Sequence, residues 1–385
     1  MHSIEGRLIR RLLAGAYKTR GLSTGVLTGR ARGEAAIVSG VDWARFLDLS
    51  LSHGVSGVLY RELTGDTAAR ETAGVPADVM ARLRADFLRI SAYRLANEKA
   101  IRELDEAVAG SGLRVCLIQG AALPYVLYAS PGMRPMCDID LLVRADALPR
   151  LTGLLASLGY AAESEAPVVY TRGTVTLDVH TEPVEFSRFG GVTPLSVTAD
   201  DVLGEAGPLT RPGGLLVPSG PDVFILACAH LMKHSFMRLI WFHDIILLSR
   251  YTGIGPDELW KRADMLGLVK PVRMSLELAK AYQGFDAGFP PPPRGLGFLE
   301  TRMLAALSRS GPVNGAGDLL YIAGMDTFQG RLSYMRSALS PPSRDALPGG
   351  TAHCRNTGDT RAGRLGRNIR LCASAAYSLL KGSMA

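Results

Sequence analysis

The sequence lacks several features that would assign it to a well-defined class. Its five cysteines lie far apart with no CxxC pair, which argues against a zinc module and suits a reducing cytoplasm. It has no uninterrupted run of about 18 apolar residues, because the best stretch, 113–129, contains Arg114, Gln119 and Pro124. The first residues also lack an apolar segment followed by a small-residue cleavage site. These absences exclude a spanning helix, predict no secretory signal and favour a cytoplasmic protein.

Charged residues are also few, at 21% of the chain against 47% hydrophobic residues, so neither wholesale disorder nor a fibrous protein fits. No internal repeat is visible. The length of 385 residues allows two or three compact units of roughly 100–200 residues each. The composition therefore predicts a globular protein with a sizeable core.

The net charge of +7 is carried by the two ends of the chain. Residues 1–33 contain seven Lys and Arg against one Glu, and residues 331–385 contain nine against two Asp. The segment between them, 34–330, is therefore net acidic. A protein that lies along nucleic acid usually carries its basic stripe on the folded body. The charge distribution thus argues against a nucleic-acid partner.

Two interpretations of the basic ends are open. In the first, which we favour because the pattern is short, they are solvated and partly disordered arms. In the second, the N-terminal segment is an amphipathic helix that makes peripheral contact with an anionic membrane surface or a partner. The apolar side of that helix would carry Leu8, Ile9, Leu12, Leu13 and Tyr17.

The hydrophobic pattern predicts an α+β fold in which a small mixed sheet is embedded between N-terminal and C-terminal helical regions. We predict a basic N-terminal arm at 1–40, a helical lead-in at 41–112, an αβ core at 113–220, a helical domain at 221–340 and a basic, partly disordered tail at 341–385. Within the core, we expect strands at 114–118, 138–143, 168–171 and 175–180, a short helix opened by Gly120, and an amphipathic helix at 148–158.

Three aspartates in this core are candidates for metal binding. Because side chains alternate along a strand, Asp138 and Asp140 point the same way. Asp178 stands likewise between two apolar residues of a later strand. If the two strands are neighbours, three carboxylates converge, and like charges so close raise one another's pKa unless a cation neutralises them. Oxygen ligands favour a hard ion, so the expected cofactor is Mg²⁺ or Mn²⁺.

Phosphate-binding features accompany these carboxylates. Gly120 stands at a strand-to-helix turn, where backbone N–H groups can approach phosphate oxygens. Arg134 is placed to bind further phosphate charge. Together with the carboxylates, these residues indicate metal-assisted phosphoryl or nucleotidyl transfer.

The segments IQGAALPYVLYASPGMRPMCDIDLLV and VTLDVH, followed by a helical H-x3-H segment, resemble a known family. They are similar to the nucleotidyltransferase superfamily of DNA polymerase beta. More closely, the chain from about 41 to 285 resembles the bacterial, uncharacterised nucleotidyltransferase family. The resemblance implies a palm-type sheet and an enzyme that uses a nucleoside triphosphate (NTP). It also implies transfer of a nucleoside monophosphate to a hydroxyl or phosphate of a small-molecule or peptide/protein acceptor.

The resemblance also implies roles for individual residues. Asp138 and Asp140 would ligate the metal ions, and Asp178 would complete the site and orient or deprotonate the acceptor. The triphosphate would lie on the turn of Gln119, Gly120 and Ala121. The closer family has a lysine where this chain has Gln119, and the superfamily a serine where it has Ala121. The loss of that lysine supports an alternative, a catalytically weak or inactive relative that binds a nucleotide or a partner.

Histidines downstream of the core admit functional and structural interpretations. His230 and His234 have the i, i+4 spacing of a zinc pair, but a metalloprotease needs Glu where Leu231 stands, so that class is excluded. Lys233 and His234 would either reach the nucleotide or acceptor from the helical domain or form a solvated helix edge.

Two further polar residues fall in apolar segments. His180 shares a strand face with Asp178, and is equally well interpreted as a partner of the metal ligands or as a hydrogen-bonded core histidine. Asp244, beside Trp241 in an apolar helix, is predicted to be buried and paired.

Overall fold

The structure is a computed structural model with a mixed α+β architecture. It describes residues 3–18, 40–64, 74–123, 127–128, 130–163, 169–184, 197–210, 213–251, 253–284, 288–290, 292, 295–324, 332 and 374. Residues 19–39 of the predicted basic arm, and all of the predicted tail except residue 374, lie outside the described residues.

A seven-stranded mixed sheet organises the central part of the chain, with the strand order β3-β4-β5-β2-β1-β7-β6. Strands β2 and β5 pair in parallel, as do β1 and β7, and the other neighbours are antiparallel. The strands are β1 (Val115–Leu117), β2 (Ile139–Leu142), β3 (Ala161–Ala162), β4 (Val169–Arg172), β5 (Val175–His180), β6 (Gly207–Pro208) and β7 (Leu215–Val217).

The predicted strands all appear, and the mixed α+β fold class is confirmed. The antiparallel pair β4–β5 turns at Gly173, where φ is +60° and glycine is favoured. The sheet is wider than predicted because β3, β6 and β7 extend it. These strands span only two or three residues, too few for the alternation that marks a strand in a sequence.

The sheet separates two hydrophobic cores. The smaller core lies between the sheet, the long helix α4 (Ala77–Ala109) and helix α7 (Leu148–Ser157), and contains Ile139, Leu141 and Leu177. The larger core joins the N-terminal helices to the C-terminal helices and takes in Leu142. Since side chains alternate along a strand, the residues between the small-core positions of β2 and β5 face the C-terminal helices.

The N-terminal helices are α1 (Ile4–Lys18), α2 (Trp43–Ser52) and α3 (Ser56–Thr64). The apolar side of α1 is buried in the larger core by Leu8, Ile9, Leu12 and Leu13, against α2, α3 and α12. Residues 4–14 are therefore not a solvated arm, and this apolar side is not available to a membrane surface. The sequence did not indicate this packing, because arginines flank the apolar positions on both sides.

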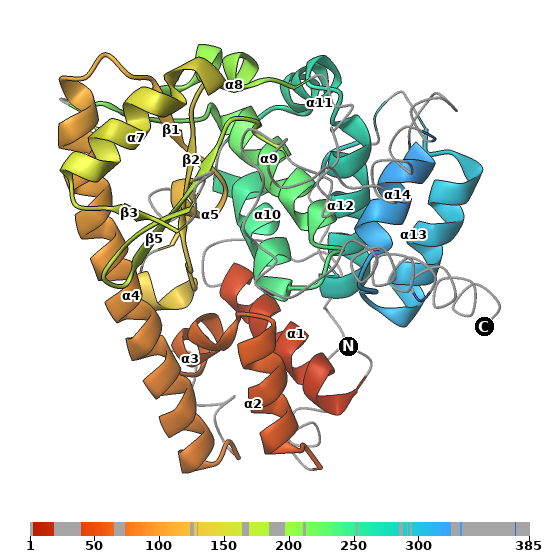
Figure 1. Cartoon of the computed structure of the whole chain (residues 1–385). Helices are drawn as coiled ribbons and strands as arrows, with labels where there is room; N and C mark the ends of the chain where they lie inside the picture. Colours follow the sequence, from red (N-terminus) through yellow and green to blue (C-terminus); the bar gives the residue numbers. More distant parts are fainter. Residues whose placement is uncertain are drawn as a thin grey trace.

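Helix α4 runs along one side of the molecule, from the N-terminal helices to the sheet (Figure 1). The short turn η2 (Pro131–Met133) packs against α3 and α4. This approach requires glycine, because a Cβ at Gly57 would lie 1.9 Å from the carbonyl oxygen of Gly132, and one at Gly132 would lie 2.6 Å from the Phe87 ring. The contact fixes the loop that leads into β2.

The C-terminal helices cover the other side of the sheet. Helix α9 is central, since it packs against α5, α10, α11, α12 and α14 (Figure 1). The remaining elements are α5 (Gln119–Ala122), η3 (Ala145–Ala147), α8 (Ala199–Glu205), α9 (Gly220–Lys233), α10 (Leu239–Tyr251), α11 (Pro256–Met265), α12 (Val269–Gln283), α13 (Phe298–Ser310) and α14 (Ala316–Gly324). None of the described helices is both long enough and apolar enough to cross a bilayer.

Candidate active site

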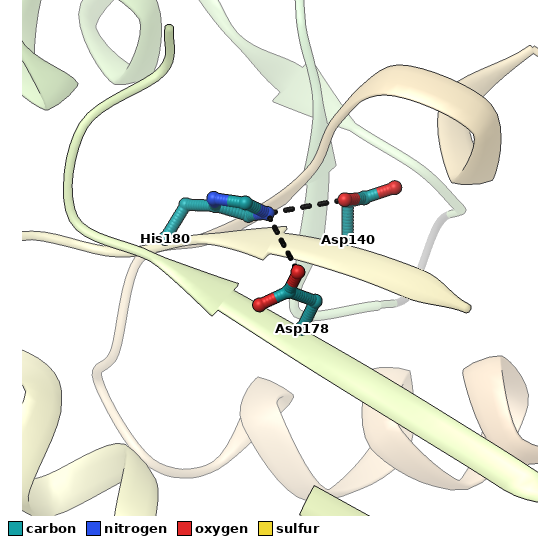
Figure 2. Close-up of side chains that lie close together, drawn as sticks. All are labelled: Asp140, Asp178 and His180. Carbon is teal, nitrogen blue, oxygen red and sulfur yellow. Dashed lines mark hydrogen bonds and ion pairs between the residues drawn. The ribbon is translucent and has the colours of Figure 1, made fainter. Parts of the chain in front are cut away.

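Three buried polar side chains meet on the face of the sheet that the C-terminal helices cover. Asp140 of β2 lies directly opposite Asp178 of β5 in the parallel pairing. His180 follows on the same face of β5, and Figure 2 shows its ring directed at both carboxylates. The Nε2 atom of His180 is 3.1 Å from Oδ1 of Asp140 and 3.7 Å from Oδ2 of Asp178.

The cluster has the composition of a metal site. One ligand atom from each residue can be chosen so that all three lie within 4.8 Å of one another, the only such group found in the described part of the chain. Each residue is at most 7% exposed. The carboxylates of Asp140 and Asp178 face each other away from solvent and repel each other. The imidazole of His180 can offset at most one of these two negative charges. A divalent cation would balance this charge.

Asp138 lies just before β2 and is half-buried. Burial, and then the charges of Asp140 and Asp178, raise its pKa to about 7. The charges of both cluster carboxylates thus contribute to the raised pKa of Asp138. Asp138 is not a member of the tight cluster, in which His180 is the third residue.

Arg134 is buried between the sheet and α10 in a two-pronged ion pair. Its Nη2 donates to Oδ2 of Asp244 at 2.9 Å and its Nε to Oδ1 at 3.0 Å. The hydroxyl of Tyr128 donates to the same carboxylate at 2.5 Å. The prediction that Asp244 is buried and paired is confirmed. The sequence analysis assigns no role to Tyr128, although this residue lies within the segment that carries the family resemblance.

The same guanidinium borders the predicted phosphate-binding turn. A Cβ at Gly120 would lie 3.0 Å from Nη1 of Arg134, so the guanidinium packs closely against the turn and a side chain at residue 120 would displace it. Nη1 is the guanidinium nitrogen that does not bond to Asp244. The Asp244 pair therefore holds Arg134 with Nη1 towards the turn.

The turn itself joins β1 to α5. The N–H of Ile118 donates to the carbonyl oxygen of Asp140 at 3.0 Å, which ties the turn to the strand that carries the cluster. Gln119 adopts a left-handed conformation with φ of 49°. Ala121 is fully buried in the smaller core, so its side chain faces away from any ligand.

A small hollow joins this turn to helix α9. Its volume is about 10 Å³, enough for roughly one water molecule. Gln119 lines it from the turn, and His230 and Lys233 line it from α9. Lys233 thus lines the same hollow as Gln119, the residue that stands where the closer family has a lysine.

His234 ends α9 as its C-cap residue. Its ring centroid is 4.5 Å from that of His230 and 4.9 Å from that of Trp241. The predicted role of His234 in reaching the nucleotide or acceptor stays a prediction.

A mixed sheet that presents paired aspartates beside a glycine turn is the arrangement expected of a nucleotidyl-transferring protein. Comparison with protein families matches residues 39–284 to a family described as uncharacterised nucleotidyltransferase. This match covers more than half of the chain, so the protein belongs to that family, as the resemblance indicated. No curated protein and no solved structure matches the chain.

Proposed function

We propose that the protein is a metal-dependent nucleotidyltransferase that moves a nucleoside monophosphate from an NTP to an acceptor. The acceptor is a hydroxyl or phosphate of a small molecule, peptide or protein, and the reaction takes place in the cytoplasm. Family membership supports nucleotidyl transfer in general. The observation that carries the finer proposal is the buried Asp140–Asp178–His180 cluster beside the Gly120 turn.

The residues present fit a divalent cation. Asp140 and Asp178, with Asp138 beside them, would hold Mg²⁺ or Mn²⁺, because carboxylate oxygens are preferred ligands of both ions. His180, hydrogen-bonded to Asp140, would fix the orientation of that carboxylate. When bound, such ions neutralise phosphate charge and make the acceptor oxygen a better nucleophile.

The other residues then have defined tasks. The acceptor oxygen forms a bond to the α-phosphorus of the NTP while the bond to pyrophosphate breaks, and Asp178 orients the acceptor and receives its proton. Arg134 would stabilise the charge on the phosphates from the Gly120 turn, and Lys233 from α9. Lys233 would thereby replace the cation that Gln119 does not provide.

The proposal is tested by pyrophosphate release from each of the four NTPs with Mg²⁺ and a panel of hydroxyl and phosphate acceptors. We expect Asp140→Asn to lower the rate on the order of 10³-fold or more, because a shared metal ligand is lost. Asp146→Asn is the matched control, since Asp146 is an exposed aspartate paired with Arg144. Equal rates for the wild type and Asp140→Asn would contradict the proposal.

Calorimetry with NTP and Mg²⁺ separates the proposed enzyme from the alternative of an inactive relative. Binding that depends on Asp140, without pyrophosphate release from any acceptor, would favour the binding protein.

A further inference from the structure

Three aromatic rings form a cluster where α9 meets α10, next to the hollow at the Gly120 turn. The ring centroids of His230 and His234 are 4.5 Å apart, and that of Trp241 is 5.2 Å from His230 and 4.9 Å from His234. All three residues are half-buried. The guanidinium carbon of the exposed Arg238 lies 5.6 Å from the centroid of the Trp241 ring.

His230 connects this ring cluster to the candidate active site. It lines the hollow that Gln119 and Lys233 also line. Its pKa is well below the ordinary value because the ring is buried, and because His234, Lys233, Arg134 and His180 add positive charge nearby. The imidazole is therefore neutral at neutral pH, with one nitrogen able to donate a hydrogen bond and the other to accept one.

One nitrogen of the His230 ring has no hydrogen-bond partner in the described part of the protein. Among the described residues, Nδ1 of His230 is shielded from solvent and has no hydrogen-bond partner. A buried polar atom in that condition destabilises the protein unless a ligand or water bonds to it. This unpartnered nitrogen is a second observation beside the ring contacts, and it points to a polar ligand at His230.

We infer that the ring cluster of His230, His234 and Trp241 is the subsite for the base of the nucleotide. This inference rests on the proposed function, which places the phosphates at the Gly120 turn and Lys233. The base must then lie within a nucleotide's length of the hollow, and the ring cluster borders the hollow through His230.

The chemistry of the cluster suits a nucleobase. Bases stack on aromatic side chains and on guanidinium planes, both of which are found here in Trp241 and Arg238. A neutral imidazole can bond to the polar edge of a base.

Calorimetry with two ligands in the presence of Mg²⁺ tests the inference. The four NTPs present base, sugar and phosphates, and inorganic tripolyphosphate presents the phosphates alone. We expect the wild-type protein to bind at least one NTP about tenfold or more tightly than tripolyphosphate. Trp241→Ala should weaken the binding of that NTP by about 5- to 100-fold, as expected for the loss of one stacked ring. The affinity for tripolyphosphate should change by less than about twofold.

Further variants keep the test decisive. Trp241→Phe retains a stacking ring and should stay within about threefold of the wild type. His234→Ala, at a half-exposed helix end, should show the same selective loss if Trp241→Ala does not fold. His230→Ala should reduce the differences in affinity among the four NTPs. Trp43→Ala is the control: it removes a half-buried tryptophan from α2 and should change the affinity for neither the NTP nor tripolyphosphate.

Three results would overturn the inference. If Trp241→Ala and His234→Ala weaken the binding of NTP and tripolyphosphate equally, or weaken the binding of neither, the rings have no selective contact with the base. If the wild type binds tripolyphosphate as tightly as every NTP, the subsite is wrong while the phosphate site of the proposed function stands. If neither ligand binds, the proposed function fails and the subsite with it.

Discussion

Asp105 of α4 and the pair Asp140–Asp178 of the sheet are all buried aspartates, but they have opposite surroundings. Asp105 of α4 is 6% exposed, and the protein satisfies its carboxylate with the N–H groups of Gly214 and Leu215, at 2.9 and 2.7 Å, and with the hydroxyl of Thr210. Asp140 and Asp178 are equally buried but face each other. A buried carboxylate with neutral donors on both oxygens stabilises a fold, whereas two that face each other store repulsion. The comparison separates an aspartate that ties β7 to α4 from the two aspartates of the proposed cation site.

The largest expected effect is on catalysis, in Asp178→Asn. Loss of a metal ligand and of the group that receives the acceptor proton should lower the rate of pyrophosphate release on the order of 10³-fold or more. Because one of two repelling charges is removed, the free energy of unfolding of the metal-free protein should stay unchanged or rise. Pyrophosphate assays and denaturant unfolding measure the two quantities. A less stable Asp178→Asn protein would show that this aspartate resembles Asp105.

The next effect is on stability and binding together, in Asp244→Ala. This change leaves the Arg134 guanidinium buried without its partner, which costs about 3–5 kcal/mol in the free energy of unfolding. Because Nη1 of Arg134 would no longer be held at the Gly120 turn, KM for the NTP should rise about tenfold.

The pair of Arg262 and Asp222, with two bonds of 2.7 and 2.9 Å between α11 and α9, is the matched control. Asp222→Ala should cost a similar free energy of unfolding and leave KM unchanged. Equal changes of KM in both variants would mean that Asp244 acts only through stability.

Asp105→Ala should have the reverse profile of Asp178→Asn. Its loss removes the acceptor of the Leu215 N–H and of the Thr210 hydroxyl, whereas the N–H of Gly214 keeps the backbone carbonyl oxygen of residue 105 at 3.2 Å. The free energy of unfolding should therefore fall by about 3 kcal/mol. Pyrophosphate release per folded molecule should remain at the wild-type rate. If Asp105→Ala loses more activity than the decrease in its folded fraction explains, Asp105 also contributes to the active site and the contrast with Asp178 fails.

Much of this site could be predicted from the sequence, for reasons that are local. Strand alternation placed Asp138 and Asp140 on one side, and also Asp178 and His180, because apolar residues stand between them. That the two strands are neighbours was a hypothesis of the sequence analysis, and the structure adds that they pair in parallel with Asp140 opposite Asp178. The choice of His180 as the third member of the tight cluster follows from that register.

Other features had no local signal. The bond between Arg134 and Asp244 joins residues 110 positions apart, and neither neighbourhood in the sequence indicates the other. The apolar side of α1 fits a surface helix as well as a buried one, and only its packing against α3 and α12 decides. Such facts belong to tertiary packing, which short patterns do not encode.

A smaller effect is expected when metal is added to the folded protein. A cation that binds the native state alone stabilises it by RT ln(1 + [L]/Kd), which is about 2.7 kcal/mol at a hundredfold excess over Kd. Mg²⁺ or Mn²⁺ should therefore raise the melting temperature of the wild type and of Asp105→Ala, and chelation should reverse the shift. Differential scanning calorimetry checks this, and an equal shift in Asp178→Asn would place the ion elsewhere.

The most direct test of a cation site at the Asp140–Asp178–His180 cluster is a Mn²⁺ titration followed by electron paramagnetic resonance. Mn²⁺ that binds the protein no longer contributes to the signal of the free ion, so the decrease in that signal measures binding. We expect the wild-type protein and Asp105→Asn to remove Mn²⁺ from that signal with the same affinity, and Asp140→Asn and Asp178→Asn to weaken this binding about tenfold or more. Binding that is unchanged in both cluster variants, or absent from the wild type, would contradict the account.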